Sequence, residues 1–335
     1  MPLPFILAGA AILAGGYGVK KGIDAKSDFD KADSLNSQAK NVYSEATKEL
    51  EAARDKAQRS LTQLGKTKFD IYESKLIPFV EAFSQIKNID FQDAKLKEEF
   101  KLAGLSRNDL RAIERSALEM QDVVTGGVSA LGAGGLAGLA AYGGVGALAS
   151  TAGGTAIAGL SGAAATNATL AWLGGGALSA GGFGMAGGAA VLGGIVAGPV
   201  LAVGGMMLAS KAEEARHAAS TNLSKARAAA EEMKTAAVAT GAIQKRFSEI
   251  SSVLKKLDKH FEPLLSGLQR RVAAGKDYNR YSVADRTGVM MAAALAKTIK
   301  NVLEAPLIDK DGALTSASRN VVAEAQQKLA ELENA

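Results

Sequence analysis

The order of apolar and polar residues divides the chain into four regions. From Val123 to Ser210 the sequence has no Asp, Glu, Lys, Arg or His. This run of about 88 residues far exceeds the roughly 20 needed to cross a bilayer once. A shorter apolar stretch extends from Leu3 to Val19. We therefore expect an apolar N-terminal membrane segment at 1–22, a helical stalk or bundle at 23–122, a glycine-rich membrane-inserted region at 123–210, and a long heptad helix with a C-terminal helical bundle at 211–335.

Two long polar stretches carry alanine at every seventh position, which is the spacing of a coiled-coil seam. Each stretch follows an apolar region, so the two helices would run in the same direction and lie side by side as a stalk. An alanine seam lets helices approach closely, but each contact buries little area. The stalk seam comprises Ala32, Ala39, Ala46 and Ala53 in the first helix, and Ala212, Ala219 and Ala226 in the second.

Glycine, proline and capping residues predict where the helices begin and end. We expect glycines to close helices, prolines to bend or stop them, and a serine followed three residues later by an aspartate to open them. Either Thr315 or Ser316 would cap the last helix. The closing glycines are Gly65 and Gly104, the prolines are Pro78, Pro263 and Pro306, and the opening pairs are Ser106 with Asp109 and Ser282 with Asp285.

The charge-free region combines many glycines with Leu, Val, Ile, Met and Trp, which makes it too apolar for an exposed linker. Glycines four residues apart let the backbones of membrane helices touch. We expect such packing at Gly134, Gly138, Gly184, Gly188, Gly194 and Gly198. The polar residues Thr166, Asn167 and Thr169 would either line a pore or form hydrogen bonds between helices.

Composition favours helices over strands, because the chain has only six prolines and 5% aromatic residues. The expected fold class is all-α, with a long helical stalk or bundle, a glycine-rich multi-helix membrane-inserted region and an apolar N-terminal helix. The absence of cysteine excludes disulfides and cysteine-based metal sites. A net charge of +5, with basic residues between Lys245 and Arg286, fits a solvated helical face better than a nucleic-acid surface.

Residues that catalysis or metal binding would require are sparse. His217 and His260 lie about 43 positions apart, with no spacing typical of metal ligands. The pattern Gly-Phe-Gly-Met-Ala-Gly at 182–187 matches a dinucleotide-binding motif, but it lacks the preceding strand and the later acidic residue. We therefore expect no enzyme, no catalytic residue, no cofactor and no metal.

Two resemblances support an association with membranes. The segment from Thr155 to Trp172, with the three glycines that follow, resembles the glycine- and alanine-rich membrane segment of the interferon-inducible 6-16-type family, over about a quarter of the chain. The plan of long helices around a hydrophobic insert, with an apolar N-terminal arm, is similar in architecture to cytolysin A type α-helical pore-forming toxins. These resemblances imply residence in a membrane and, for the second, pore formation.

The leading hypothesis from the sequence is a membrane-embedded helical oligomer that forms a pore or perturbs the bilayer, as a bacterial toxin or antiphage defence effector. The alternative is a membrane-anchored helical scaffold or tether that recruits a partner such as a membrane-remodelling machine. The expected partners are the lipid bilayer, further copies of this chain and a protein bound by the soluble helices. The expected location is the bacterial inner membrane, with the stalk in the cytoplasm.

Overall fold

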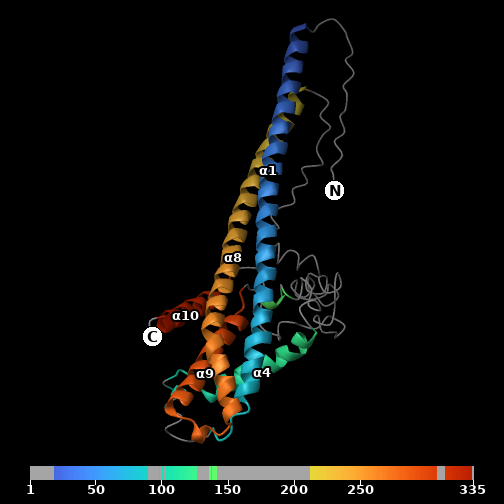
Figure 1. Ribbon diagram of the computed structural model, residues 1–335. Helices are drawn as coiled ribbons and strands as arrows, with labels where there is room; N and C mark the ends of the chain where they lie inside the picture. The colour runs from blue at the N-terminus through green and yellow to red at the C-terminus, as the bar shows by residue number, and fades with distance from the viewer. Residues whose placement is uncertain are drawn as a thin grey trace. The chain divides into compact units, whose positions relative to one another are not determined.

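The computed structural model describes residues 19–89, 98, 100–101, 103–126, 136, 138–141, 212–307 and 314–333. No strand occurs within these ranges, so the expectation of an all-α fold is confirmed for them. The named elements, shown in Figure 1, are α1 (Val19–Ile71), the π-helix η1 (Tyr72–Leu76), α2 (Ile77–Phe83), α4 (Arg107–Thr125), α8 (Ala212–Ala274), the 3-10 helix η6 (Tyr278–Arg280), α9 (Val283–Glu304) and α10 (Ser316–Glu333).

The described residues belong to two compact units. Unit 1 contains 19–54 of α1 and 212–239 of α8, and unit 2 contains the remaining described residues. Within unit 1, α1 and α8 lie side by side (Figure 1). Asn222 Nδ2 donates to Asn36 Oδ1 (3.3 Å), and the Thr47 hydroxyl lies 3.6 Å from the Met233 sulfur. Both pairs are 186 residues apart, so the two helices run parallel.

Small and bulky residues pack together between the two helices of unit 1. Ala39, Leu223 and Ala226 form a buried cluster, and Leu35 and Tyr43 pack against it. The two alanines leave room for the bulkier side chains, so α1 and α8 can lie close together in this unit.

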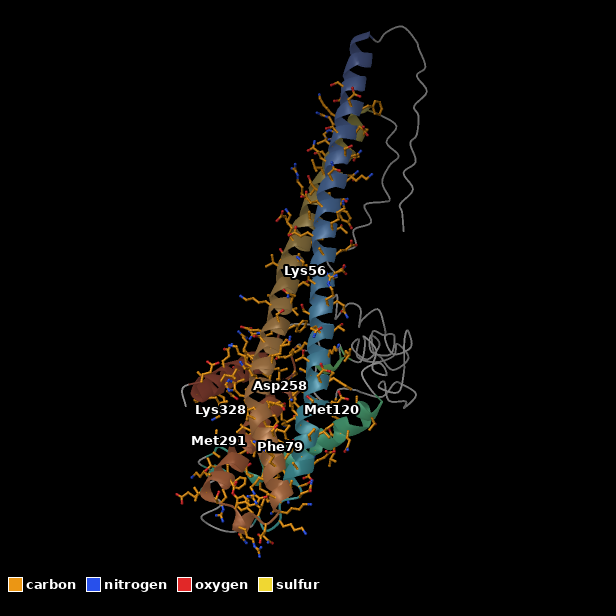
Figure 2. The ribbon with its side chains drawn as sticks, viewed as in Figure 1. Lys56, Phe79, Met120, Asp258, Met291 and Lys328 are labelled. Atoms are coloured by element: carbon orange, nitrogen blue, oxygen red, sulfur yellow. The ribbon has the colours of Figure 1, made fainter. Side chains whose placement is uncertain are left out.

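The core of unit 2 is formed where α1 and α8 meet the shorter helices. Here too α1 and α8 run parallel, because Gln244 Nε2 donates to Ser60 Oγ (3.2 Å) at a separation of 184 residues. The Phe79 ring of α2 lies 5.9 Å from the Phe261 ring of α8, measured between centroids. Phe79 and Met120 lie among the packed helices, whereas Lys328 lies on α10 (Figure 2).

Two predicted helix boundaries are wrong. Gly65 lies inside α1, and Pro263 lies inside α8 at an exposed position, where water can satisfy the backbone carbonyl that the proline leaves without a donor. Pro78, which was expected to bend its helix, occupies the first turn of α2, where no amide donor is needed. The π-helix Tyr72–Leu76 precedes it, and its backbone hydrogen bonds span five residues instead of four.

The remaining boundaries are confirmed. Ser106 with Asp109 and Ser282 with Asp285 each form a complete capping box, and Thr315 Oγ1 accepts from the Ser318 amide. Gly104 has a φ of +68°, and the amide of Leu105 donates to the Phe100 carbonyl, which is the pattern of a glycine-closed helix. Helix α9 ends at Glu304, before Pro306.

The membrane interpretation requires correction. In the parts of the chain that the structure describes, no helix has both the length and the apolar character that a bilayer crossing demands. The hypothesis of a membrane-embedded pore is therefore contradicted, and the membrane-anchored tether is unsupported. Part of the described charge-free sequence lies in the protein core. Leu136 and residues 139–141 are buried in the core of unit 2, where protein groups bind several of their carbonyls.

Replacing Ala226 with leucine should destabilise the parallel pair of unit 1. Ala226 is fully buried in the seam, and overpacking such a site costs about 1–3 kcal/mol. Ala228→Leu is the matched control, because Ala228 is exposed on the same helix and its replacement should change stability by less than about 0.5 kcal/mol. Urea unfolding followed by far-UV circular dichroism measures both. Equal stabilities of the two variants would contradict the seam.

Candidate functional site

The most unusual group in the structure is a lysine with no access to solvent. Lys68 lies on the buried face of α1, four residues after Leu64 and four before Tyr72, and its side chain is 0% exposed. The spacing of these three residues is that of one helix face, so an apolar residue would be usual at position 68. This spacing, which is visible in the sequence, was the signal that could have revealed Lys68.

The Lys68 ammonium binds carbonyls from two other segments. Its Nζ donates to the Leu303 carbonyl (2.8 Å), the Ala140 carbonyl (3.0 Å) and the Leu139 carbonyl (3.4 Å). Leu303 lies in the last turn of α9, and Leu139 and Ala140 belong to the charge-free region. The last carbonyls of a helix have no partner within the helix, and a lysine is a favourable partner for them.

We call the helical residues 136 and 138–141 the docked turn. Leu136, Leu139, Ala140 and Ala141 are all buried in the core of unit 2. Besides the bonds to Lys68, the amide of Leu307, just after α9, donates to the Ala141 carbonyl (2.7 Å). The three successive carbonyls at 139, 140 and 141 are thus all hydrogen-bonded to groups outside the turn.

Gly65 lets α1 approach the docked turn. A Cβ atom added at Gly65 would overlap the backbone carbonyl of Leu136, so only glycine fits here without a shift of the backbone. Gly65 and Lys68 lie three residues apart on α1, and both contact the docked turn. The site is therefore built from one close backbone approach and one buried ammonium.

Burial changes the protonation of Lys68. Desolvation lowers the pKa of Lys68 from 10.5 to about 7, and the negative charge of Glu304 opposes this shift only in part. Nearby, the hydroxyl oxygens of Tyr72 and Ser116 are 3.0 Å apart and form a hydrogen bond. Burial raises the pKa of the Tyr72 hydroxyl. Lys68 therefore changes its charge close to neutral pH, which makes the stability of the site sensitive to pH.

The chemistry of this site is that of a contact between segments. Lys68 is enclosed and its protons are directed at backbone carbonyls. Within the described residues, no group of three or more His, Asp or Glu side chains could hold a metal ion. His217 is exposed and His260 is half-buried, and both lie on α8.

The structure describes only some of the candidate residues that were named from the sequence. In the stalk seam, Ala32, Ala39, Ala46, Ala219 and Ala226 are buried, Ala53 is half-buried, and Ala212 begins α8. Gly138 is helical and buried within the docked turn. Outside the described residues lie Gly134, Gly184, Gly188, Gly194, Gly198, Thr166, Asn167 and Thr169.

Comparisons with family models, with curated proteins and with solved structures gave no match to this chain. The function must therefore be inferred from the arrangement of the residues themselves.

Replacing Gly65 with alanine should lower the free energy of unfolding. The added Cβ would collide with the Leu136 carbonyl, and strain of this kind costs about 1–3 kcal/mol. The matched control is Gly267→Ala in α8, where a Cβ meets no atom within 4 Å. Alanine should stabilise that helix by up to about 1 kcal/mol. Urea unfolding of both variants measures the difference, and a stabilising Gly65→Ala change would contradict the close approach.

Proposed function

We propose that this protein is a non-enzymatic helical scaffold that holds the start of its glycine-rich region in a docked position and acts by protein–protein contact when that turn is released. One observation carries the proposal: the buried side-chain nitrogen of Lys68 joins the docked turn to α9, through hydrogen bonds to the carbonyls of Ala140 and Leu303. An apolar residue of similar size could fill this core position, but it could not donate to the carbonyls of both segments, and unpaired buried carbonyls are costly.

Docking uses a surface that a second copy of the chain could otherwise bind. Leu139 and Ala140 are 0% exposed in the docked turn, so their apolar surface is fully used within the chain. Small residues such as Gly138 and Ala140 permit close helix contacts. A released turn would present this surface to another molecule, and burying it again in a homo-oligomer would recover the lost hydrophobic stabilisation.

The direction of the pH effect follows from Lys68. Because docking lowers its pKa to about 7 from the ordinary 10.5, the released state binds more protons between these values. Docking is therefore stabilised as the pH rises above about 7 and weakened as the pH falls towards it. Above about pH 10 the raised pKa of Tyr72 acts in the opposite direction, because the folded state then keeps a proton that the unfolded chain loses.

Hydrogen exchange across the docked turn tests the proposal. In the wild-type protein, protection factors of residues 138–141, corrected for intrinsic exchange, should fall as the pH is lowered from about 9 to about 6. In Lys68→Met the carbonyls lose their donor and the titrating group is gone, so protection should be low and nearly independent of pH. Lys66→Met, two residues away on the exposed side of α1, should behave as wild type.

Light scattering on the same samples tests the assembly step. Release should convert the protein into discrete homo-oligomers, so Lys68→Met should have a larger mass than Lys66→Met under identical conditions. Retained protection in Lys68→Met would refute the docking role of the lysine. Lost protection with an unchanged mass would refute assembly through the released turn.

A further inference from the structure

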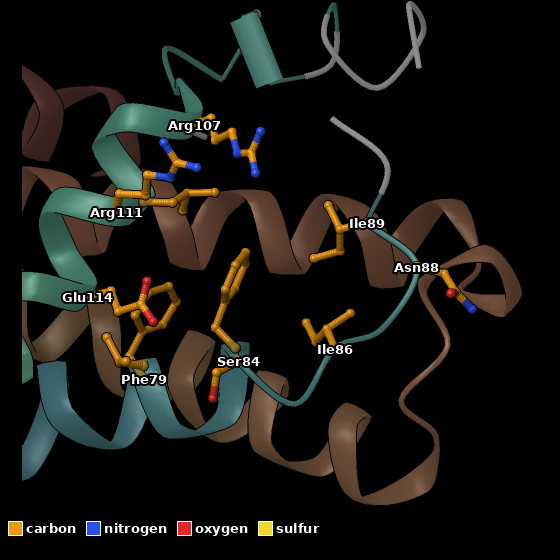
Figure 3. Close-up of a pocket in the computed structure, with 11 residues that line it drawn as sticks. Phe79, Ser84, Ile86, Asn88, Ile89, Arg107, Arg111 and Glu114 are labelled. Atoms are coloured by element: carbon orange, nitrogen blue, oxygen red, sulfur yellow. The ribbon is translucent and has the colours of Figure 1, made fainter. Parts of the chain in front are cut away.

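Unit 2 contains a cavity of about 420 Å³ that the docked turn does not line. It lies between α2 with the segment that follows it, residues 84–89, and the first half of α4 (Figure 3). Its volume falls within the range of roughly 300–1,000 Å³ that is usual for small-molecule sites. The cavity has an apolar side and a charged side, which restricts the chemistry of a ligand.

The apolar side comes mainly from α2. Phe79 is buried beneath the cavity, and Val80, Phe83 and Leu110 are half-buried around it. The rings of Phe79 and Phe83 pack with their centroids 5.5 Å apart. These side chains leave apolar surface on a cavity wall, and a hydrocarbon ligand would remove that surface from water.

The charged side comes from α4. Arg107, Arg111 and Glu114 follow one another along the cavity side of this helix (Figure 3). Their spacing of four and three residues places them on one helix face. In the described part of the chain no salt bridge includes Arg111. Along this wall the guanidinium groups of Arg107 and Arg111 lie at one end and the carboxylate of Glu114 lies at the other (Figure 3).

Hydrogen bonds to the segment after α8 hold the segment after α2 in place. The amide of Lys87 donates to the Lys276 carbonyl (2.6 Å), and the amide of Tyr278 donates to the Lys87 carbonyl (3.0 Å). Asn88, with a φ of +61°, donates through Nδ2 to Asp277 Oδ1 (2.9 Å). Asparagine tolerates this left-handed conformation better than most residues do. A preformed wall lowers the entropic cost of binding.

We propose that this cavity binds a small amphiphile with an unbranched apolar chain and an anionic head group. The chain lies against Val80, Phe83 and Leu110, and the head group binds the guanidinium groups of Arg107 and Arg111. An anion suits this end because an arginine can donate two parallel hydrogen bonds to a carboxylate or phosphate. Glu114 repels the anion from the opposite end and so sets the orientation of the ligand. This site is separate from the Lys68 contact and extends beyond the proposed function.

Titration calorimetry of the full chain with decanoate, decyl phosphate and decyltrimethylammonium, each below its micellar concentration, tests the proposal. Decanoate or decyl phosphate should bind, and the stronger of the two identifies the head group. Hexanoate should bind more weakly, because each buried methylene group contributes about fourfold in affinity. Decyltrimethylammonium should bind at least about tenfold more weakly than the anions.

Two exposed arginines of α4 provide matched variants. Arg111→Glu should weaken binding of the preferred anion by about tenfold or more, whereas Arg115→Glu, four residues further along and outside the cavity, should change it by less than about twofold. Phe83→Ala should weaken the long-chain anion more than hexanoate. Equal effects of Arg111→Glu and Arg115→Glu, preference for the cationic probe, or binding only to anionic vesicles and not to the monomeric amphiphiles would each overturn the proposal.

Discussion

Burial of one ammonium group is the interaction on which the organisation of unit 2 depends. An isolated charge in a protein core is strongly unfavourable, so the enclosed Lys68 nitrogen is surrounded by hydrogen-bond acceptors and its pKa is lowered to about 7. The acceptors are the Leu303 carbonyl, which lies in the last turn of α9 and has no partner within that helix, and the carbonyls of Leu139 and Ala140 in the docked turn. Lys68 and these carbonyls therefore require one another, and they join α1, the docked turn and α9, which are far apart in the sequence.

Small residues determine how closely the helices of each unit approach. In unit 1, Ala39 and Ala226 leave room for Leu223 between α1 and α8. In unit 2, Gly65 allows the docked turn to reach α1. In both places a small side chain lets two backbones approach closely. Such a contact buries little area and depends on how well the facing surfaces fit. A contact of this kind is sensitive to single added methyl groups.

The sequence predicted features that depend on neighbouring residues. The capping boxes at Ser106 and Ser282 and the glycine closure at Gly104 each require only a few consecutive residues, and they were predicted correctly. Gly65 and Pro263 were predicted wrongly because local propensity is overridden by packing or by exposure. Lys68 was missed, since its partners lie 71 to 235 residues away and only the fold brings them together.

The membrane prediction failed for a related reason. A charge-free sequence rich in glycine and alanine suits lipid, but it suits a tightly packed helical contact equally well. Leu139 and Ala140 show the second use, since they are buried in unit 2 and their carbonyls bind Lys68. Composition alone does not distinguish the two environments, because both favour small uncharged residues.

The central claim is that the Lys68 ammonium is enclosed by the docked turn. The most direct test is an NMR titration of the Lys68 Cε resonance in the full chain, assigned by its loss in Lys68→Arg. Enclosure predicts a titration midpoint at about 7. A midpoint near the ordinary 10.5 would show that Lys68 is solvated, and would contradict the contact of the docked turn with α1.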